Sequence, residues 1–547
     1  MRTAEQPVAA DAPGDGRDDH RSPRQHTGAA AALVAAGILG SRVLGLVRNS
    51  LIARYLGTTV AADAWTAAFK VPNTLQNLFG EGALSAAFVP VYARLLGAGE
   101  DDEADRVAGA VAAILGVTIA IFVLVGILIA PLLIYAIAPG FTGERRELTV
   151  SLTRILFPGA GFLTLSAWCL GVLNSHRKFL IAYAAPIAWN LSLIVALLWW
   201  GRMPDKAHVV TVMAWASVCG SVLQFAVQLP AVRKVAPRLR VALETTTANV
   251  REILRNFGPA FVSRGVVQIS SYIDQFLTSF LPNGMVAVFG FATTLYMLPV
   301  SMFGAAISVA ELPEMSRATA EEHEAGGMLR SRIDAGLRRI AFLVVPSAVA
   351  FLALGDVLIR VVYEHGHFTA TDAVYTWAVL CGSAVGLLAG TLGRLYSSTY
   401  YALRDTRTPL RFAVVRVVLT TVLGATFAFG VPRWFGIDAH WGAAGLSASA
   451  GLAAWVEFTL LRRRLNRRIG PTGLTGRFTI TLWALAVGSA GLAVFVQRYT
   501  ADWRRMVAGV AVIAIYGAAY LGGAMLFRVP EAHGIVAGFT RRMRPRR

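Results

Sequence analysis

Apolar residues follow one another in long runs along most of this chain. Residues 110–133 and 506–526, for example, are almost free of charge, and a run of about 20 such residues is long enough to cross about 30 Å of hydrocarbon as a helix. Alternation with a period of two over about ten residues, which marks the strands of a membrane barrel, does not occur. The pattern therefore predicts an all-α polytopic membrane protein.

Read in order, the apolar runs predict about fourteen transmembrane helices. They lie near residues 29–56, 61–96, 106–137, 148–174, 179–201, 208–232, 251–281, 285–317, 330–355, 373–401, 409–430, 440–464, 474–497 and 504–527. Alternate loops are strongly basic, as at 176–178, 233–240, 330–332, 404–411 and 462–468, and such loops face the cytoplasm. Both termini are then expected in the cytoplasm.

An internal repeat divides the chain into two related halves. The matched positions are Ser41-Arg42 with Ser263-Arg264, then Ser85, Pro90 and Arg94 with Ser308, Pro313 and Arg317, then Leu173 and Arg177 with Leu403 and Arg407. Their offsets are 222, 223 and 230 positions. Six predicted helices, an even number, lie between the equivalent positions, so both halves have the same orientation in the membrane. This spacing predicts two six-helix lobes related by a pseudo-two-fold axis along the membrane normal.

The repeat and the loops together define the expected segments. They are a disordered cytoplasmic tail at 1–28, an N-terminal lobe at 29–235, a cytoplasmic linker at 236–250, a C-terminal lobe at 251–465, two extra helices at 466–530 and a basic cytoplasmic tail at 531–547. The first 28 residues are too polar to form a core.

Composition excludes several classes of protein. Hydrophobic residues make up 55% and charged residues 15% of the chain, whereas soluble domains carry about a quarter charged residues. The net charge of +19 lies in loops and the C-terminus and not on a basic face for nucleic acid. The three cysteines are far apart, and His365 and His367 have no further ligands nearby, so no metal or cofactor is expected.

Charges at membrane depth are the best pointers to function, because each costs about 2.5 to 3.5 kcal/mol or more. Arg42 and Arg48 lie nearly two turns apart on the first helix, and Asp63 and Lys70 lie seven residues apart on one face of the second. Pro72-Asn73 is expected to interrupt the second helix and expose backbone polar groups.

Further ionisable groups follow in later helices. They are Glu81, in a glycine-flanked stretch after Asn73, then Arg264 and Asp274 in the seventh helix, Arg394 in the tenth and Arg416 in the eleventh. Arginines outnumber carboxylates, and the guanidinium fork matches pairs of phosphate oxygens. We predict an anionic substrate held by Arg42, Arg48, Asp63, Lys70, Asn73, Glu81 and Arg264.

Structural roles remain open for several of these residues. Arg48 could extend to the membrane interface, Asp63 could cap a helix near the outer face, and Glu81 could hydrogen-bond the backbone.

The residues from Arg42 to Leu95, RVLGLVRNSLIARYLGTTVAADAWTAAFKVPNTLQNLFGEGALSAAFVPVYARL, resemble the opening of the MurJ/MviN family. Further similarities are APGF at 138–141, GVLNSHRKF at 171–179, YEHGHFTATDA at 363–373 and YALRDTRTP at 401–409. These lipid II flippases belong to the multidrug/oligosaccharidyl-lipid/polysaccharide exporter superfamily. The resemblance implies fourteen helices in two lobes around a cationic cavity, with the last two helices lining a groove for the lipid tail.

Carried over by position, the resemblance places the family's first-helix arginines at Arg42 and Arg48, its second-helix aspartate at Asp63 and its lysine at Lys70. Asp274 matches an aspartate that helps hold sodium in some members, and the partner positions are Thr420 and Gly424. The chain departs from the family at five sites where many members are charged. They are Asn49, Gln76, Asn77, Thr294 and Met297. Either Arg264, Arg394 or Arg416 substitutes for the missing charges, or the substrate differs.

The sequence therefore predicts a transporter, not an enzyme, that flips lipid II between leaflets of the bacterial inner membrane by alternating access, in peptidoglycan biosynthesis. Without a phosphate-binding GxxxxGK[ST] motif, the drive would be membrane potential or a coupled ion. The expected partners are lipid II, membrane lipids and the cell-wall synthesis and division machinery, and the protein is expected to be monomeric. Alternatives are a flippase for another polyprenyl-diphosphate glycan, such as an O-antigen or exopolysaccharide unit, a cation-coupled drug exporter, and a non-transporting scaffold.

Overall fold

A computed structural model describes residues 23–305, 307, 308, 311, 315, 326–499 and 505–534 of the chain. These residues form helices joined by short loops, with no strand among them. Eleven of the described helices are long and apolar enough to cross a membrane. The prediction of an all-helical, multi-pass membrane fold is confirmed.

The N-terminal lobe contains the first half of these helices. They are α1 (Pro23–Leu56), α2 (Val60–Gln76), η1 (Asn77–Leu84), α3 (Ser85–Gly97), α4 (Asp101–Leu128), α5 (Ala130–Ile137), α6 (Gly143–Ser175), α7 (Phe179–Trp200) and α8 (Lys206–Val235). The segments α2, η1 and α3 follow one another without a break, and one residue separates α4 from α5.

The C-terminal lobe and the two extra helices follow. They are α9 (Ala248–Ser279), α10 (Met285–Pro299), η2 (Val300–Ala305), α12 (Gly326–Tyr363), α13 (Ala370–Ala402), α14 (Arg407–Ala425), η3 (Thr426–Gly430), α15 (Val431–Phe435), η4 (Ala439–Trp441), α16 (Gly442–Ile469), α17 (Gly476–Tyr499) and α18 (Arg505–Leu526). The extra helices α17 and α18 pack on each other and on α12.

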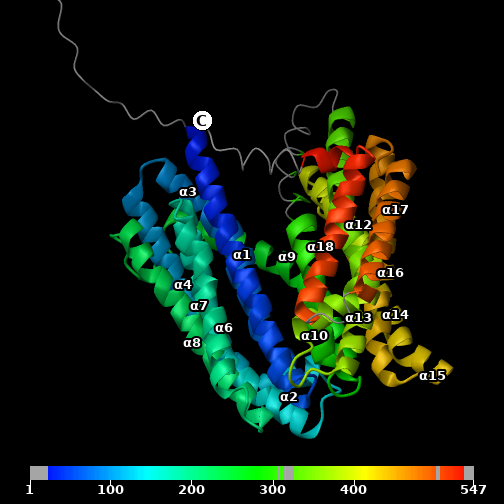
Figure 1. Ribbon diagram of the computed structural model, residues 1–547. Coiled ribbons are helices and arrows are strands. Elements are labelled where there is room, and N and C mark those ends of the chain that lie inside the picture. The colour runs from blue at the N-terminus through cyan, green and yellow to red at the C-terminus, as the bar shows by residue number, and fades with distance from the viewer. Residues whose placement is uncertain are drawn as a thin grey trace, which may run out of the picture.

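The two lobes lie side by side and are closest at one end. In Figure 1 they converge near α2, at the lower end of the view, and diverge toward the upper end. The loops at the converging end are those that we predict to face outward, because they carry few lysines or arginines. The structure therefore brings the lobes together at the predicted outer face.

The internal repeat is visible in the helical geometry. Both η1 and η2 are π-helical stretches, and their first residues, Asn77 and Val300, lie 223 positions apart, which is the offset between Ser85 and Ser308. Helix α6 packs extensively on α8 in the first lobe, and α13 packs on α16 in the second. Equivalent crossings thus widen at equivalent points.

The predicted interruption at Pro72-Asn73 is wrong. Helix α2 continues through Pro72 to Gln76 and passes directly into η1. A proline removes one backbone hydrogen bond, and here the chain stays helical and takes the wider π geometry a few residues later. This crossing is widened, not broken.

Helix α9 differs from its counterpart α1, because its beginning packs on the opposite lobe. It contacts α3 and η1 of the N-terminal lobe, and Arg94 of α3 forms an ion pair with Glu252 at 2.9 Å. The preceding linker is attached to the same lobe, since the backbone N–H of Arg238 donates to Asp105 Oδ2 at 2.9 Å. The linker and the start of α9 are therefore bound to the N-terminal lobe.

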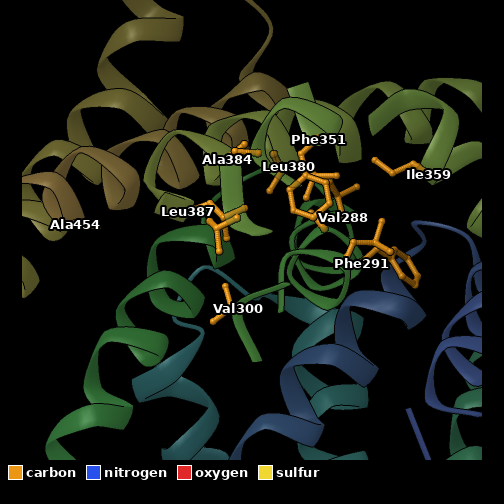
Figure 2. Packing of buried hydrophobic residues seen from close by; sticks show 14 of the residues in the cluster. Val288, Phe291, Val300, Phe351, Ile359, Leu380, Ala384, Leu387 and Ala454 are labelled. Carbon is orange, nitrogen blue, oxygen red and sulfur yellow. The ribbon is translucent and has the colours of Figure 1, made fainter. Parts of the chain in front are cut away.

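Apolar side chains from α10, α12 and α13 interlock in the largest core. Figure 2 shows Val288 and Phe291 of α10 beside Phe351 of α12 and Leu380 of α13. Each of these side chains is buried. The core holds α10 as a fixed part of the C-terminal lobe, with its N-terminus at the converging end.

Close backbone contact between α13 and α16 leads to a stability prediction. A Cβ on Gly386 would lie 2.3 Å from Gly451 Cα, so Gly386→Val should overpack this contact and cost about 1 to 3 kcal/mol. The thermal midpoint of the purified protein in detergent measures the change. Gly488→Val on α17 is the control, because a Cβ there meets nothing within 4 Å; equal midpoints for the two variants would contradict the prediction.

Candidate functional site

Arg48 lies on α1 with neutral partners around its guanidinium. It donates from Nη1 to Asn190 Oδ1 at 2.9 Å and from Nε and Nη2 to Asn49 Oδ1 at 3.2 and 3.0 Å, and it stacks over the Trp189 ring at 4.7 Å. It forms no ion pair with a carboxylate among the described residues. The side chain is half-buried, so its positive charge is positioned without being neutralised.

Asn49 and Thr294 connect this cluster to the opposite lobe. The amide of Asn49 donates from Nδ2 to Thr294 Oγ1 of α10 at 3.1 Å. Both positions depart from the charged residues that many members of the resembling family carry. The structure shows that these two departures form one contact, because a neutral amide meets a neutral hydroxyl across the lobes.

Arg42 makes a second contact across the lobes, about two turns before Arg48. Its Nη1 donates to Ser301 Oγ of η2 at 2.7 Å, and the arginine is exposed. Ser301 stands where the helix is π-helical. Arg42 therefore bridges the lobes by one hydrogen bond to a hydroxyl and keeps most of its donors free of partners in the described part of the chain.

Lys70 of α2 faces the end of α9. Its Nζ donates to the backbone carbonyl of Ser271 at 2.5 Å, and its ammonium interacts electrostatically with the carboxylate of Asp274. The same carboxylate also faces Arg416 of α14. Lys70 and Asp274 thus form a polar link between the two lobes.

Asp63 is the most tightly held charge at the converging end. Its carboxylate is fully buried and pairs with Arg145 Nη2 of α6 at 2.6 Å. It also accepts hydrogen bonds from the backbone N–H groups of Gly284 at 2.6 Å and Ala287 at 2.8 Å. These groups belong to the N-terminus of α10, where the helix dipole favours an anion.

Arg145 completes this cluster, and no sequence motif singled it out. Its Nη1 donates to Asn283 Oδ1 at 3.2 Å, and its guanidinium lies 3.7 Å from the centre of the Phe141 ring. The signal that could have identified Arg145 is the group of charged residues at 144–147, which follows the APGF motif at 138–141. Asp63 and Arg145 come from the N-terminal lobe, whereas Asn283, Gly284 and Ala287 come from the C-terminal lobe.

Other contacts join the lobes at the same end, and we call the whole set the outer seam. Thr58 Oγ1 donates to Asp372 Oδ1 at 2.5 Å, the N–H of His367 donates to the carbonyl of Arg54 at 2.8 Å, and Gly140 N–H donates to Ser279 Oγ at 3.1 Å. The backbones approach so closely that only glycine fits at several points.

Three of these glycines, Gly57, Gly284 and Gly366, also have positive φ, of 59°, 90° and 67°. A Cβ on Gly366 would lie 2.3 Å from the Arg54 carbonyl oxygen. A Cβ would lie 2.5 Å from the His367 carbonyl oxygen at Gly57 and 2.3 Å from the Thr58 carbonyl oxygen at Gly284. Both conditions favour glycine, since a side chain would be strained and would also clash.

Three predicted site residues remain, and the side chain of one of them, Asn73, is described. Asn73 lies within the N-terminal lobe, where it lines a cavity of about 10 Å³ with Phe69, Gly159 and Ser221. The side chains of Glu81 and Arg264 lie outside the described residues, so their predicted roles are not tested.

The residues around Asp274 do not fit a sodium ion. Lys70 and Arg416 already face this carboxylate, and Gly424, at one of the expected ligand positions, offers no side-chain oxygen. Thr420 Oγ1 is buried without a hydrogen-bond partner, but one hydroxyl and one neutralised carboxylate are a poor donor set. Ion coupling through Asp274 stays a prediction.

The arrangement separates two kinds of charge. At the outer seam, the anion Asp63 is neutralised by an arginine and a helix terminus. Arg42 and Arg48, toward the diverging end, keep their charge beside hydroxyl and amide groups. Such a surface can bind an anion, and it lacks a nucleophile with a base or a group of metal ligands among the described residues.

Comparison with known proteins relates this chain to one family. The family model described as "Lipid II flippase MurJ" matches residues 52–512. The chain is 33% identical over 443 residues to the "Probable lipid II flippase MurJ" of Rhizobium tropici, covering 80% of each protein. It is 32% identical over 473 residues to the "Lipid II flippase MurJ" of Burkholderia cenocepacia, covering 84% of this chain and 89% of the relative.

Solved structures support the same fold. A lipid II flippase MurJ in an inward closed conformation superposes with a TM-score of 0.73 at 23% identity and covers 91% of this chain and 98% of the other. A multidrug transporter of the MATE family, in an inward-facing conformation, has a TM-score of 0.57 at 19% identity and covers 80% of this chain and 94% of the other. With the match over residues 52–512, this chain belongs to the lipid II flippase MurJ family.

Proposed function

We propose that this protein moves lipid II from the inner to the outer leaflet of the bacterial inner membrane by alternating access. Membership of the family supports the substrate. The observation that carries the proposal is the pair of arginines, Arg42 and Arg48, which face neutral groups between the lobes. A diphosphate supplies the negative charge that these arginines lack.

Arg48 is prepared to hold a phosphate. Three hydrogen bonds and the Trp189 ring fix its guanidinium, so little conformational entropy is lost when an anion binds. Arg42 gives up one hydrogen bond to Ser301, which a phosphate oxygen replaces. Lys70 can exchange the Ser271 carbonyl for the substrate in the same way. These residues therefore bind the head group while the lobes diverge toward the cytoplasm.

The outer seam keeps the substrate from leaving in this state. Separating the lobes there would pull Asp63 and Arg145 away from Asn283 and the N-terminus of α10. Each hydrogen bond to a charged group that is lost in this way contributes about 1.5 to 3 kcal/mol, so these contacts oppose opening. We infer that Asp63 acts in transport as part of this closure, and that binding of the head group between the lobes offsets the cost of opening.

The basic loops predict the orientation of the protein in the membrane, and the membrane potential can supply energy for transport. With the basic loops inside, both termini are cytoplasmic, and the lobes open first toward the leaflet in which the precursor is made. The membrane potential contributes about 2.3 kcal/mol per elementary charge per 100 mV, enough to bias a cycle that moves charged groups. We propose that the protein works as a monomer beside the cell-wall synthesis and division machinery.

A cation-coupled drug exporter is not favoured. The MATE structure shares the fold, but a cationic drug needs an acidic surface, and the residues between the lobes here include Arg42 and Arg48.

Complementation tests the proposal. In a bacterium depleted of its own lipid II flippase, this chain should restore growth and the exposure of lipid II on the outer face. Arg48→Ala should reduce exposure by about tenfold or more, because it removes charge-assisted bonds to phosphate worth about 1.5 to 3 kcal/mol. Lipid II on the outer face is measured in intact cells.

The matched control is Arg433→Ala, which removes an exposed arginine of α15, away from the lobe contact. It should behave like the parent. Full membrane expression of the parent without any rescue would reject lipid II as the substrate, and full activity of Arg48→Ala would reject its role.

Asp63→Asn should weaken the outer seam. The neutral amide has one acceptor oxygen where the carboxylate offers two to the N–H groups of Gly284 and Ala287, and it has no charge to interact with the N-terminus of α10. The outward-open population should increase by tenfold or more if about 1.4 kcal/mol or more is lost. Spin labels at Met203 and Ile437, exposed residues on the outer loops of the two lobes, report the separation by double electron–electron resonance after the native cysteines are replaced.

Glu144→Gln serves as control, since this carboxylate is exposed and adjacent to Arg145. Unchanged distance distributions in Asp63→Asn would show that the carboxylate does not close the outer face.

A further inference from the structure

A second pair of arginines, besides Arg42 and Arg48, lies in the C-terminal lobe. Arg394 is on α13 and Arg416 is on α14. They are eight and nine residues from the ends of their helices that we predict to be cytoplasmic, so at about 1.5 Å per residue they lie at similar depth. The two guanidiniums repel each other, and both interact electrostatically with Tyr296 of α10.

Arg394 makes no direct contact with a carboxylate in the described part of the chain, and Glu457 acts on it only electrostatically. Arg394 is exposed and has no hydrogen bond or ion pair within the described ranges. One turn before it, Gly390 faces α10, since a Cβ there would lie 3.9 Å from the Tyr296 hydroxyl oxygen. Residues four apart share a helix face, which places Arg394 on the side of α13 that faces Tyr296.

Arg416 makes one direct ion pair among the described residues, and the carboxylate of Asp274 also acts on it electrostatically. Arg416 Nη1 contacts Glu457 Oε2 of α16 at 3.2 Å, with the side chains 38% and 14% exposed. Arg416 Nε is buried without a hydrogen-bond partner. The single contact with Glu457 therefore leaves donors of Arg416 available.

Two arginines at this depth and close to each other are costly unless an anion joins them. A phosphate group accepts from two guanidinium forks at once, and its charge removes the repulsion. Glu457 pairs with Arg416 and acts on Arg394 only electrostatically, and the Asp274 carboxylate near Arg416 is shared with Lys70. The unused Nε of Arg416 and the unpartnered Arg394 leave room for a second anion.

We propose that Arg394, Arg416 and the Tyr296 hydroxyl form a phosphate-binding subsite on the C-terminal lobe, where Glu457 competes with the phosphate for Arg416. The ligand class is the diphosphate of a lipid-linked substrate, so the inference rests on the proposed function. The subsite gives the C-terminal lobe its own contact with the head group, opposite Arg42 and Arg48 on the N-terminal lobe. A diphosphate bound to both lobes then couples binding to their relative movement.

Binding of inorganic diphosphate to the purified full-length protein tests the subsite. Arg394→Gln and Arg416→Gln should each weaken binding by about tenfold or more. Glu457→Gln should strengthen binding, because it removes the competing carboxylate and retains the shape of the side chain. Arg433→Gln is the matched control and should bind like the parent.

The opposite effects on binding of Arg416→Gln and Glu457→Gln distinguish this proposal from a purely structural ion pair. If Arg416 and Glu457 only hold α14 against α16, both variants lower the thermal midpoint and neither strengthens binding, and the proposal is overturned. If Arg416→Gln does not fold, the loss in Arg394→Gln and the gain in Glu457→Gln still decide the outcome.

The source of the phosphate is tested in nanodiscs. Polyprenyl diphosphate in phosphatidylcholine should bind to the parent more tightly than to Arg394→Gln. If phosphatidylglycerol removes this difference, the subsite binds bulk anionic lipid and the proposal is wrong. Arginine-dependent diphosphate binding without rescue of a flippase-depleted cell would keep the subsite and reject lipid II as the substrate.

Discussion

A carboxylate buried between membrane helices must be neutralised where it stands, and the ion pair between Asp63 and Arg145 meets this requirement at the boundary of the two lobes. The fully buried carboxylate is 2.6 Å from the guanidinium and also accepts from two N–H groups at the start of α10. Since α2 and α6 belong to one lobe and α10 to the other, the same contacts that solve an electrostatic problem also hold the lobes together. The closed outer face depends on them.

The diverging side of the lobes follows a different electrostatic rule. Arg42 and Arg48 contact hydroxyl, amide and aromatic groups, none of which carries a negative charge. Positive charges that are held in place but not neutralised favour an anionic ligand over any internal partner. The contrast between a neutralised outer seam and a cationic inner surface is what the proposed transport requires, because the ligand supplies the missing negative charge while the outer face is closed.

Two of the positions at which this chain departs from the family, Asn49 and Thr294, contact each other. Asn49 and Thr294 are 245 positions apart and donate and accept one hydrogen bond of 3.1 Å. The two departures therefore meet in one neutral contact across the lobes. Asn49 also accepts from Arg48, which leaves that arginine with neutral neighbours and keeps its charge available for the substrate.

Apolar runs and loop charges by themselves determined the helical class and the multi-pass arrangement, because the hydrocarbon thickness sets helix length and each helix satisfies its own backbone. They also identified Arg42, Arg48, Asp63 and Lys70, since charge is rare at membrane depth. Only the tertiary structure decided that Pro72 leaves its helix continuous, that Asp63 pairs with Arg145, and that Arg416 contacts Glu457. Partner choice depends on side chains that approach from helices distant in sequence, and hydrophobic periodicity along one helix contains no information about which residue lies opposite.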